Sequence, residues 1–203
     1  MGLKNLINQL YHEFKFKYVA WRFYNKNNRS ERDWIDFLKE IKKEREIIGD
    51  ETYRIVAEYN RKRRLRWLRD HKEEIEKLAE LYENQPEKLI TKVFYEMYLG
   101  CKFEGRDKDS ELIKIEKKGN LTILHYICGN DCPILKYSLK NNMDPLPICK
   151  KAYELGAEAF LNELINMVYN GYEVVYTRDY TSLRPRGRFC YEIVILKKKD
   201  EKN

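Results

Sequence analysis

The sequence predicts an α+β protein, with a helical first half that includes one long basic helix and a second half that forms a small antiparallel four-stranded sheet with packed helices. Apolar residues recur every three or four positions through most of residues 3–98, which is the period of an amphipathic helix. The second half instead contains short runs rich in β-branched and aromatic residues, and these predict strands over 111–116, 121–127, 172–177 and 189–197.

Helical patterns at 133–140 and 148–168 separate the second predicted strand from the third. An antiparallel sheet covered on one side by helix is the simplest way to bury the apolar face of such strands. We place the domain boundary before residue 86. This gives a helical region over 1–85 and a cysteine-bearing α+β domain over 86–203.

Three helices are expected in the first region. The first covers 3–24, the second runs from an N-cap at Ser30 to Gly49, and the third covers roughly 51–83. The third has no apolar residue between Asn60 and Arg64, so it must cross open solvent there or bend. We expect the apolar stripe of the first helix to belong to the core. Its members are Leu3, Leu6, Ile7, Leu10, Phe14, Tyr18 and Trp21.

Composition limits the class of protein. Charged residues make up 36% of the 203 residues, a tendency of hyperthermophile proteins, and the formal net charge is +7. The sequence contains no apolar stretch long enough to span a membrane, and its first residues lack the apolar block of a signal peptide. We therefore expect a cytoplasmic protein with no membrane partner.

Four of the five cysteines fall in the last 76 residues, at the ends of predicted elements. A tetrahedral site for zinc, or an iron–sulfur cluster, takes thiolates from turns and element ends. The predicted metal ligands are Cys128, Cys132, Cys149 and Cys190. The alternatives are cysteines that pack separately in the core, and a disulfide or reactive thiol. Cys101 lies in a polar loop, and we expect it to lie outside any site. His125 alternates with apolar residues, which favours a structural histidine over a metal ligand.

Several segments of the second half carry a family resemblance. They are Cys132-Pro133-Ile134-Leu135, Cys149 followed by Tyr153, Arg178-Asp179-Tyr180 leading to Leu183-Arg184-Pro185, and Cys190-Tyr191-Glu192. Over residues 86–196 the chain resembles the aminothiazoline-carboxylate hydrolase-like family, many of whose members are archaeal. In its order of elements it is also loosely similar to the 4-vinyl reductase domain, a ligand-binding fold in which cysteines hold a metal. The resemblance implies site residues at Cys132, Cys149 and Cys190, with Cys128 as a fourth.

The loop before Cys190 is basic. Guanidinium groups pair with a carboxylate or phosphate through two hydrogen bonds, which suggests an anion-binding loop beside the cysteines. A solvated basic loop is the alternative. The candidate ligand-binding residues are Tyr180, Arg184, Arg186 and Arg188.

Residues 61–72 hold seven Lys or Arg side chains and one acid. Such a surface neutralises phosphates, which predicts contact with nucleic acid. An ion-paired exposed helix and a contact with a partner helix are the alternatives. The candidate nucleic-acid residues are Arg61, Lys62, Arg63, Arg64, Arg66 and Arg69.

Three functions follow from these observations. The leading hypothesis is a metal- or small-ligand-binding protein with a cysteine site for zinc or an iron–sulfur cluster, in a sensor or carrier role. The second is a small-molecule C–N or amide hydrolase of the aminothiazoline-carboxylate hydrolase type, which would use the same cysteines. The third is a nucleic-acid-binding protein that uses the basic helix. A homodimer is compatible with each of the three. No Ser/His/Asp set or phosphate loop identifies catalytic residues.

Overall fold

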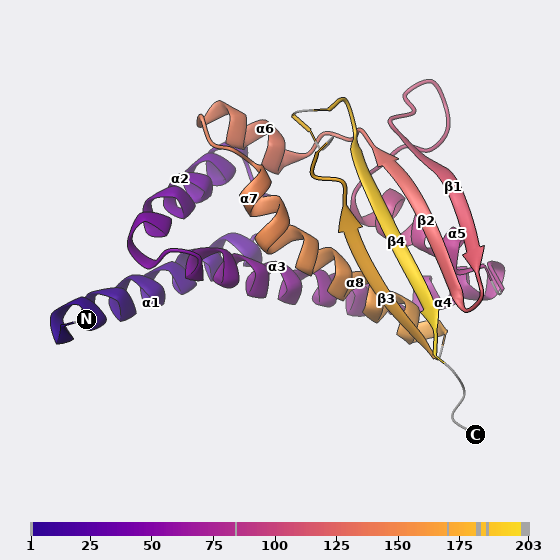
Figure 1. Ribbon diagram of the computed structural model, residues 1–203, viewed down its shortest axis with the longest axis horizontal. Helices are drawn as coiled ribbons and strands as arrows, with labels where there is room; N and C mark the ends of the chain where they lie inside the picture. Colours follow the sequence, from indigo (N-terminus) through magenta and orange to yellow (C-terminus); the bar gives the residue numbers. More distant parts are fainter. Residues whose placement is uncertain (1, 84, 170, 182–183, 186, 200–203) are drawn as a thin grey trace. The chain divides into compact units, whose positions relative to one another are not determined.

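The computed structural model describes residues 2–83, 85–169, 171–181, 184–185 and 187–199. It confirms the predicted α+β class, with helices first and then a four-stranded antiparallel sheet packed against helices. Figure 1 shows the four strands side by side, with β1 and β3 at the edges. The strands are β1 (Ser110–Lys118), β2 (Leu121–Cys128), β3 (Tyr172–Arg178) and β4 (Cys190–Lys198).

The chain forms two compact units, and each is built from two segments. Unit 1 comprises residues 1–63 and 132–156, and unit 2 comprises 64–131 and 157–203. The units therefore divide the chain at other places than the expected boundary before residue 86. The first division, between residues 63 and 64, falls inside the helix that we expected over 51–83, and the others fall at 131–132 and 156–157.

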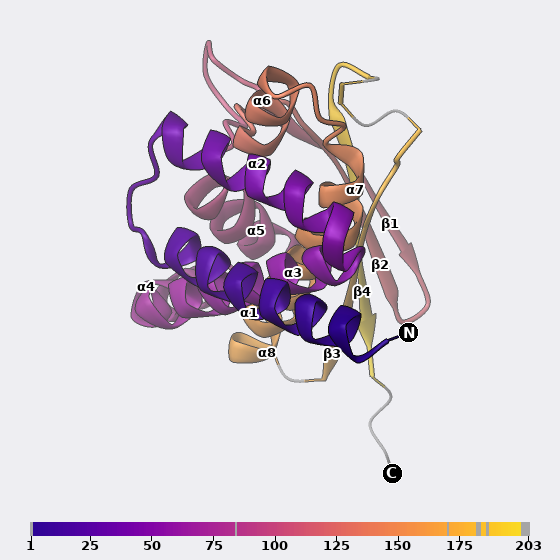
Figure 2. The same ribbon diagram turned by 90° about the vertical axis from the view of Figure 1, so that its left-hand side faces the viewer.

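Unit 1 is helical. Its elements are α1 (Leu3–Asn25), α2 (Glu31–Ile48), the first part of α3 (Glu51–Asp70), α6 (Pro133–Lys140), α7 (Leu146–Ile148), the π-helix η2 (Cys149–Tyr153) and the start of α8 (Glu154–Val168). Figure 2 shows α1 and α2 as neighbouring helices. Stacked aromatic rings fill the space between these two helices, with the Phe23 and Phe37 centroids 3.9 Å apart.

The face of α1 that meets this core is not the predicted one. The buried residues of α1 are Phe16, Ala20, Phe23 and Tyr24. Leu3, Leu10 and Phe14 of the expected stripe are instead 73%, 56% and 78% exposed. The prediction that the aromatic residues of this helix belong to the core is confirmed for Phe16, Phe23 and Tyr24, and it was wrong for the aromatic residues of the stripe. The physical reason is that α1 is apolar on two faces, and the described residues cover only one of them.

The start of α2 follows the prediction. The Ser30 side chain accepts a hydrogen bond from the backbone N–H of Asp33, and the Asp33 carboxylate accepts one from the backbone N–H of Ser30. These reciprocal bonds satisfy two N–H groups that a helix start otherwise leaves open. Deeper in α2, the fully buried Glu44 accepts hydrogen bonds from His12 at 2.8 Å and from Lys15 at 3.1 Å, which ties α1 to α2.

The predicted helix over 51–83 is two helices. α3 ends at Asp70, and α4 (Lys72–Leu81) begins after His71, whose backbone is not helical. The His71 ring stacks on Trp67 with centroids 4.0 Å apart, and its Nδ1 lies 2.8 Å from the Trp67 carbonyl oxygen. We expected the helix to bend or to cross open solvent between Asn60 and Arg64, which was wrong, because α3 is continuous there and both residues are buried. The break falls at His71 instead.

Unit 2 contains the sheet and the helices that cover one of its faces. α5 (Pro86–Ile90) continues into the π-helix η1 (Thr91–Tyr98). Side chains of η1 and α8 form one core with the sheet, in which Phe94, Phe160 and Tyr176 are fully or almost fully buried. Gly119 and Asn120 close the hairpin between β1 and β2, with Gly119 at a φ of 60°, as a two-residue hairpin turn requires.

Strand order places β4 between β2 and β3, so the last strand lies in the interior of the sheet. The core face carries Leu124, Tyr126 and Cys128 from β2, together with Glu192, Val194 and Leu196 from β4. None of the described helices is long and apolar enough to cross a membrane.

Candidate functional site

The first feature of the candidate site is a pair of cysteines on neighbouring strands. Cys128, the last residue of β2, is the direct cross-strand partner of Cys190, the first residue of β4. Directly opposed residues in an antiparallel pair point to the same face, and here this is the face that meets the core. Cys128 is buried and Cys190 is half-buried. Two of the four predicted metal ligands therefore share one end of the sheet.

A third thiol reaches this end from the cysteine that we expected to lie outside any site. The Sγ atom of Cys101 lies 3.3 Å from the Sγ atom of Cys128, and Cys101 is buried. Cys101 therefore contacts a predicted metal ligand, although we expected it to lie outside any site. Gly100, at a φ of 70°, ends the preceding helix, and the Cys101 N–H donates to the Tyr95 carbonyl at 2.8 Å. We call Cys101, Cys128 and Cys190 the cysteine end of the sheet.

The electrostatic setting keeps the Cys128 thiol protonated. The contact with the Cys101 thiol and burial raise the pKa of Cys128 well above its ordinary value, and the charge of Glu192 acts in the same direction. A thiol in this state is a weak nucleophile, because the thiolate is the reactive form. Binding of a metal ion would have to displace the proton.

Arg184 holds the loop after β2 against the start of β4. Its Nε lies 3.3 Å from the Cys190 Sγ, and its Nη1 donates to the Asn130 carbonyl at 2.8 Å and to the Gly129 carbonyl at 3.2 Å. Asn130 in turn donates from Nδ2 to the Leu99 carbonyl at 2.9 Å. Arg184 is therefore engaged with backbone carbonyls and one sulfur, whereas the sequence suggested a clamp for an anion.

The other described residues of the predicted anion loop are Tyr180 and Arg188. Tyr180 is half-buried. Arg188 is exposed, with its guanidinium 5.1 Å from the centroid of the Phe189 ring. Arg186 lies outside the described residues. Among the described residues of this set, Arg184 contacts a predicted cysteine, Cys190.

A buried ion pair lies on the same face as the cysteine end. Glu192, two residues after Cys190, is 2% exposed, and its Oε1 accepts a hydrogen bond from Arg178 Nε at 3.1 Å. Arg178 Nε also lies 2.9 Å from the Tyr176 hydroxyl. Burial raises the pKa of Tyr176 and of Tyr95 well above the ordinary value. The Glu192 carboxylate is therefore engaged with Arg178.

The remaining two predicted metal ligands belong to unit 1. Cys132 is the N-cap of α6, Cys149 begins η2, and both are half-buried. Because the four cysteines are distributed over the two units, the four-thiolate centre stays a prediction. Within the described ranges, no group of three or more His, Cys, Asp or Glu side chains is arranged to hold a metal ion.

The contacts of His125 agree with the prediction that it is a structural histidine. Its Nδ1 lies 2.7 Å from the Tyr191 hydroxyl and its Nε2 lies 3.0 Å from the Glu116 carboxylate. Both ring nitrogens therefore have protein partners.

Some basic side chains of the segment 61–72 pack inside the protein and others are exposed to solvent. Arg64 is 4% exposed, and its guanidinium lies 5.1 Å from the Tyr98 ring centroid and 5.8 Å from that of Phe94. This burial removes Arg64 from the surface that a nucleic acid could contact. Lys62 pairs with Glu58 at 2.6 Å, and Arg63 is half-buried. The exposed arginines of the predicted set are Arg61, Arg66 and Arg69.

Comparison of the chain with family models, with curated proteins and with solved structures finds no match. The resemblance to the hydrolase-like family therefore stays a prediction, and the function has to be argued from the site itself.

Proposed function

We propose that this chain is a binding protein in a sensor or carrier role, and that its ligand is a soft metal ion such as zinc, held at the cysteine end of the sheet. One observation carries the proposal, namely the 3.3 Å separation of the Cys101 and Cys128 sulfurs beside the cross-strand partner Cys190. Two thiolates on one tetrahedral zinc, each at about 2.3 Å, lie about 3.8 Å apart. The thiol pair is close to that spacing.

Metal binding at the cysteine end would require a rearrangement of Cys190 and the loss of a proton from Cys128. Arg184 contacts the Cys190 sulfur at 3.3 Å, so Cys190 would have to leave this contact in order to join the thiol pair as a third ligand. Thiols prefer soft and borderline metals over magnesium or calcium. Since the pKa of Cys128 is raised, uptake of the metal would release a proton, and affinity would fall as the pH falls.

Metal analysis of protein purified without oxygen, followed by titration with zinc against a chromophoric chelator, tests this proposal. We expect one zinc per chain, and we expect Cys101→Ser, Cys128→Ser and Cys190→Ser each to weaken its binding. An absorbance scan distinguishes zinc from an iron–sulfur cluster. A folded wild-type chain that takes up neither metal contradicts the proposal.

Two further variants, Cys132→Ser and Cys149→Ser, identify the ligand set. If they keep wild-type zinc affinity, the site is confined to unit 2. If they lose zinc together with Cys128→Ser and Cys190→Ser, the predicted centre of Cys128, Cys132, Cys149 and Cys190 is supported instead. Thr52→Ala, at a buried hydroxyl remote in sequence from all five cysteines, serves as the control for a general loss of packing.

A second candidate function is contact with nucleic acid through α3. The observation that favours it is that Arg61, Arg66 and Arg69 are exposed and form no ion pair within the described part of the chain. Exposed guanidinium groups without an acidic partner are available for phosphates. Fluorescence anisotropy with a labelled duplex tests this, and binding should weaken as salt rises. Arg66→Ala with Arg69→Ala should reduce it, whereas Lys197→Ala on β4 should not. Absence of binding at low salt excludes the candidate.

A further inference from the structure

We propose that the exposed apolar stripe of α1 is the seat of a second copy of this chain, and that the two α1 helices pair antiparallel about a two-fold axis. The stripe consists of Leu3, Leu6, Ile7, Leu10, Tyr11, Phe14, Tyr18 and Trp21. Each of these residues is between 43% and 78% exposed, although all are large and apolar or aromatic. This inference does not depend on metal binding.

The size of the stripe fits a dimer. With a side-chain area of about 200 Å² for each residue, the exposed fractions give roughly 900 Å² on one face of one helix. A stable interface of standard size buries about 800 Å² on each partner, and its centre is enriched in aromatic residues. Single exposed apolar residues need no explanation, whereas a contiguous patch of this size marks an interaction surface.

The spacing within the stripe indicates a helix as the partner. Leu3, Ile7, Leu10, Phe14 and Trp21 follow alternating steps of four and three, with Lys17 at the position between Phe14 and Trp21. This is the repeat of helices that pack along a common seam. A membrane surface fits less well, because an interfacial helix needs a basic flank. In α1, Lys15 pairs with Glu44 and Lys17 pairs with Glu13 at 2.6 Å.

Lys17 decides the direction of the second helix. In a parallel pair, Lys17 would face the partner's Lys17 across the seam, and like charges would meet. In an antiparallel pair centred between Leu10 and Phe14, Lys17 lies opposite the partner's Ile7, and its aliphatic stem covers that side chain. An antiparallel pair also closes with two-fold symmetry, the commonest symmetry of soluble dimers.

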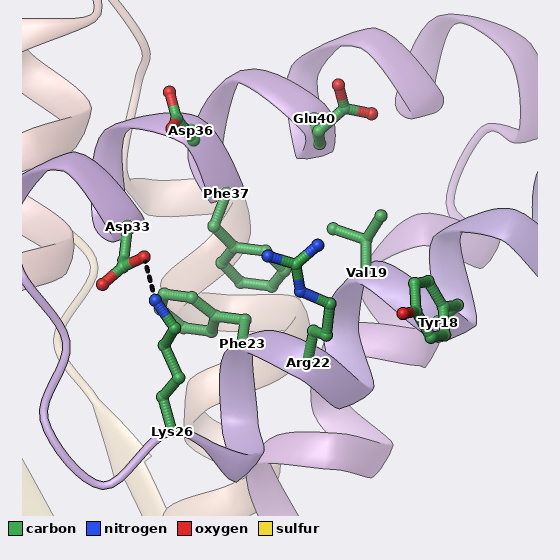
Figure 3. Close-up of a pocket in the computed structure, with 9 residues that line it drawn as sticks. All are labelled: Tyr18, Val19, Arg22, Phe23, Lys26, Asp33, Asp36, Phe37 and Glu40. Atoms are coloured by element: carbon green, nitrogen blue, oxygen red, sulfur yellow. Dashed lines mark hydrogen bonds and ion pairs between the residues drawn. The ribbon is translucent and has the colours of Figure 1, made fainter.

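A hollow beside the stripe provides a place for one anchoring side chain. Its volume is about 200 Å³, and its lining includes Tyr18 of the stripe together with Val19, Phe23 and Phe37 (Figure 3). An apolar cavity of about 150 Å³ accommodates a benzene molecule, so this hollow has room for a leucine. In the antiparallel pair the partner's Leu6 is level with Tyr18.

The rim of the hollow adds charge complementarity. Asp36 and Glu40 of α2 lie at the rim, and Arg22 of α1 reaches toward α2 between Phe37 and Val19 (Figure 3). The first turn of α1 contains no acidic residue, and it carries Lys4. In the antiparallel pair the partner's first turn, with Lys4 and the positive end of the helix dipole, approaches these carboxylates.

Sedimentation equilibrium of the full chain tests the proposal with two matched variants. Wild type should be a dimer. Leu10→Glu places an acid at the centre of the seam and should weaken the dimer by about 30-fold or more. Ile7→Glu carries the same change on the same helix, but the new carboxylate faces the partner's Lys17, so the dimer should persist. Leu81→Glu, at a 71% exposed leucine of α4, should have no effect. Circular dichroism confirms that each variant is folded.

Each other outcome overturns the proposal. A monomeric wild type shows that no second copy covers the stripe. If that monomer sediments with vesicles containing anionic lipid, and Leu10→Glu abolishes this, the occupant is a membrane surface. Equal loss of the dimer in Ile7→Glu and Leu10→Glu excludes the antiparallel pairing, and a dimer that survives Leu10→Glu lies on another surface.

Discussion

The sulfur atoms of Cys101 and Cys128 lie 3.3 Å apart, although the two cysteines are 27 positions apart in the chain. The contact joins the third residue after η1 to the last residue of β2, and both side chains are buried. This relationship organises the end of the sheet at which Cys190 and Arg184 also lie.

The thiol pair predicts the product of mild oxidation. Diamide, which accepts two electrons and two protons, should link Cys101 to Cys128, and peptide mapping should recover that disulfide. Because the pKa of Cys128 is raised, little thiolate is present at neutral pH, so the reaction should accelerate as the pH rises. Closing a loop of this length should stabilise the protein by about 3.5 kcal/mol.

Cys101→Ser is the control for this reaction, because it removes one partner and leaves the sheet intact. Saturating zinc should slow the reaction if the metal uses the same sulfurs. A disulfide between Cys128 and Cys190 in the wild type would show that the cross-strand pair reacts in preference to the thiol pair.

The sequence predicts those features of the cysteine end that depend on neighbouring residues, and it does not predict those that depend on residues distant in the chain. The strand that ends at Cys128 and the strand that begins near Cys190 follow from local periodicity, and the structure confirms both to within one residue. Their opposition depends on the pairing of β2 with β4, which are separated by more than 60 residues. Cys101 was missed because the residues around it are polar. The alternation of Cys101 with Phe103 was the local signal of an inward-facing side chain.

The error on α1 has a different origin. Periodicity detects that a helix is apolar on a face, and it detected the stripe from Leu3 to Trp21 correctly. It does not say which of two apolar faces the rest of the chain will cover. Phe16, Ala20 and Phe23 pack against α2 because the ring stack with Phe37 is available there. The stripe is left for a contact outside the single chain, which a core-directed interpretation could not anticipate.

Glu44 should be the most sensitive charged position of unit 1. Its side chain is fully buried between His12 and Lys15, so Glu44→Gln removes the charge while keeping the shape. We expect the free energy of unfolding to fall by about 2 kcal/mol, the range for hydrogen bonds to a charged group. Urea unfolding followed by circular dichroism measures this change. Glu40→Gln is the control, since its ion contact with Lys15 is 3.8 Å long, and a loss as large as that of Glu44→Gln would contradict the argument.

The start of α2 predicts a dependence of stability on acid. Hydrogen bonds from Lys26 and Ser30 lower the pKa of Asp33 from 3.8 to about 2. Because the folded pKa is below the unfolded one, the stabilisation is present above about pH 4 and is lost as the pH falls toward 2. Asp33→Asn should therefore be less stable than wild type at pH 7, and the difference should shrink at pH 2.

Two variants separate the charge of Asp33 from the cap itself. Ser30→Ala should lose about 1 kcal/mol at neutral pH, because it removes the side-chain acceptor of the N-cap. Asp36→Asn lies on the next turn of α2, outside the capping box, and thermal unfolding across pH should leave its profile parallel to that of wild type. A constant difference between Asp33→Asn and wild type from pH 7 to pH 2 would rule out the assigned pKa shift.

Removal of one partner of the Arg178–Glu192 ion pair should destabilise the fold more than replacement of both partners by apolar residues. The two side chains are 12% and 3% exposed, and their contact is 3.1 Å. Arg178→Met leaves the Glu192 carboxylate buried without its cation, which should cost about 3–5 kcal/mol. The double variant Arg178→Met with Glu192→Met removes both charges, so it should recover most of that loss. Urea unfolding of the two single variants and the double variant, compared with wild type, gives the coupling energy directly. If the double variant loses as much unfolding free energy as the two single variants lose together, the two residues act independently, which would contradict a stabilising ion pair between them.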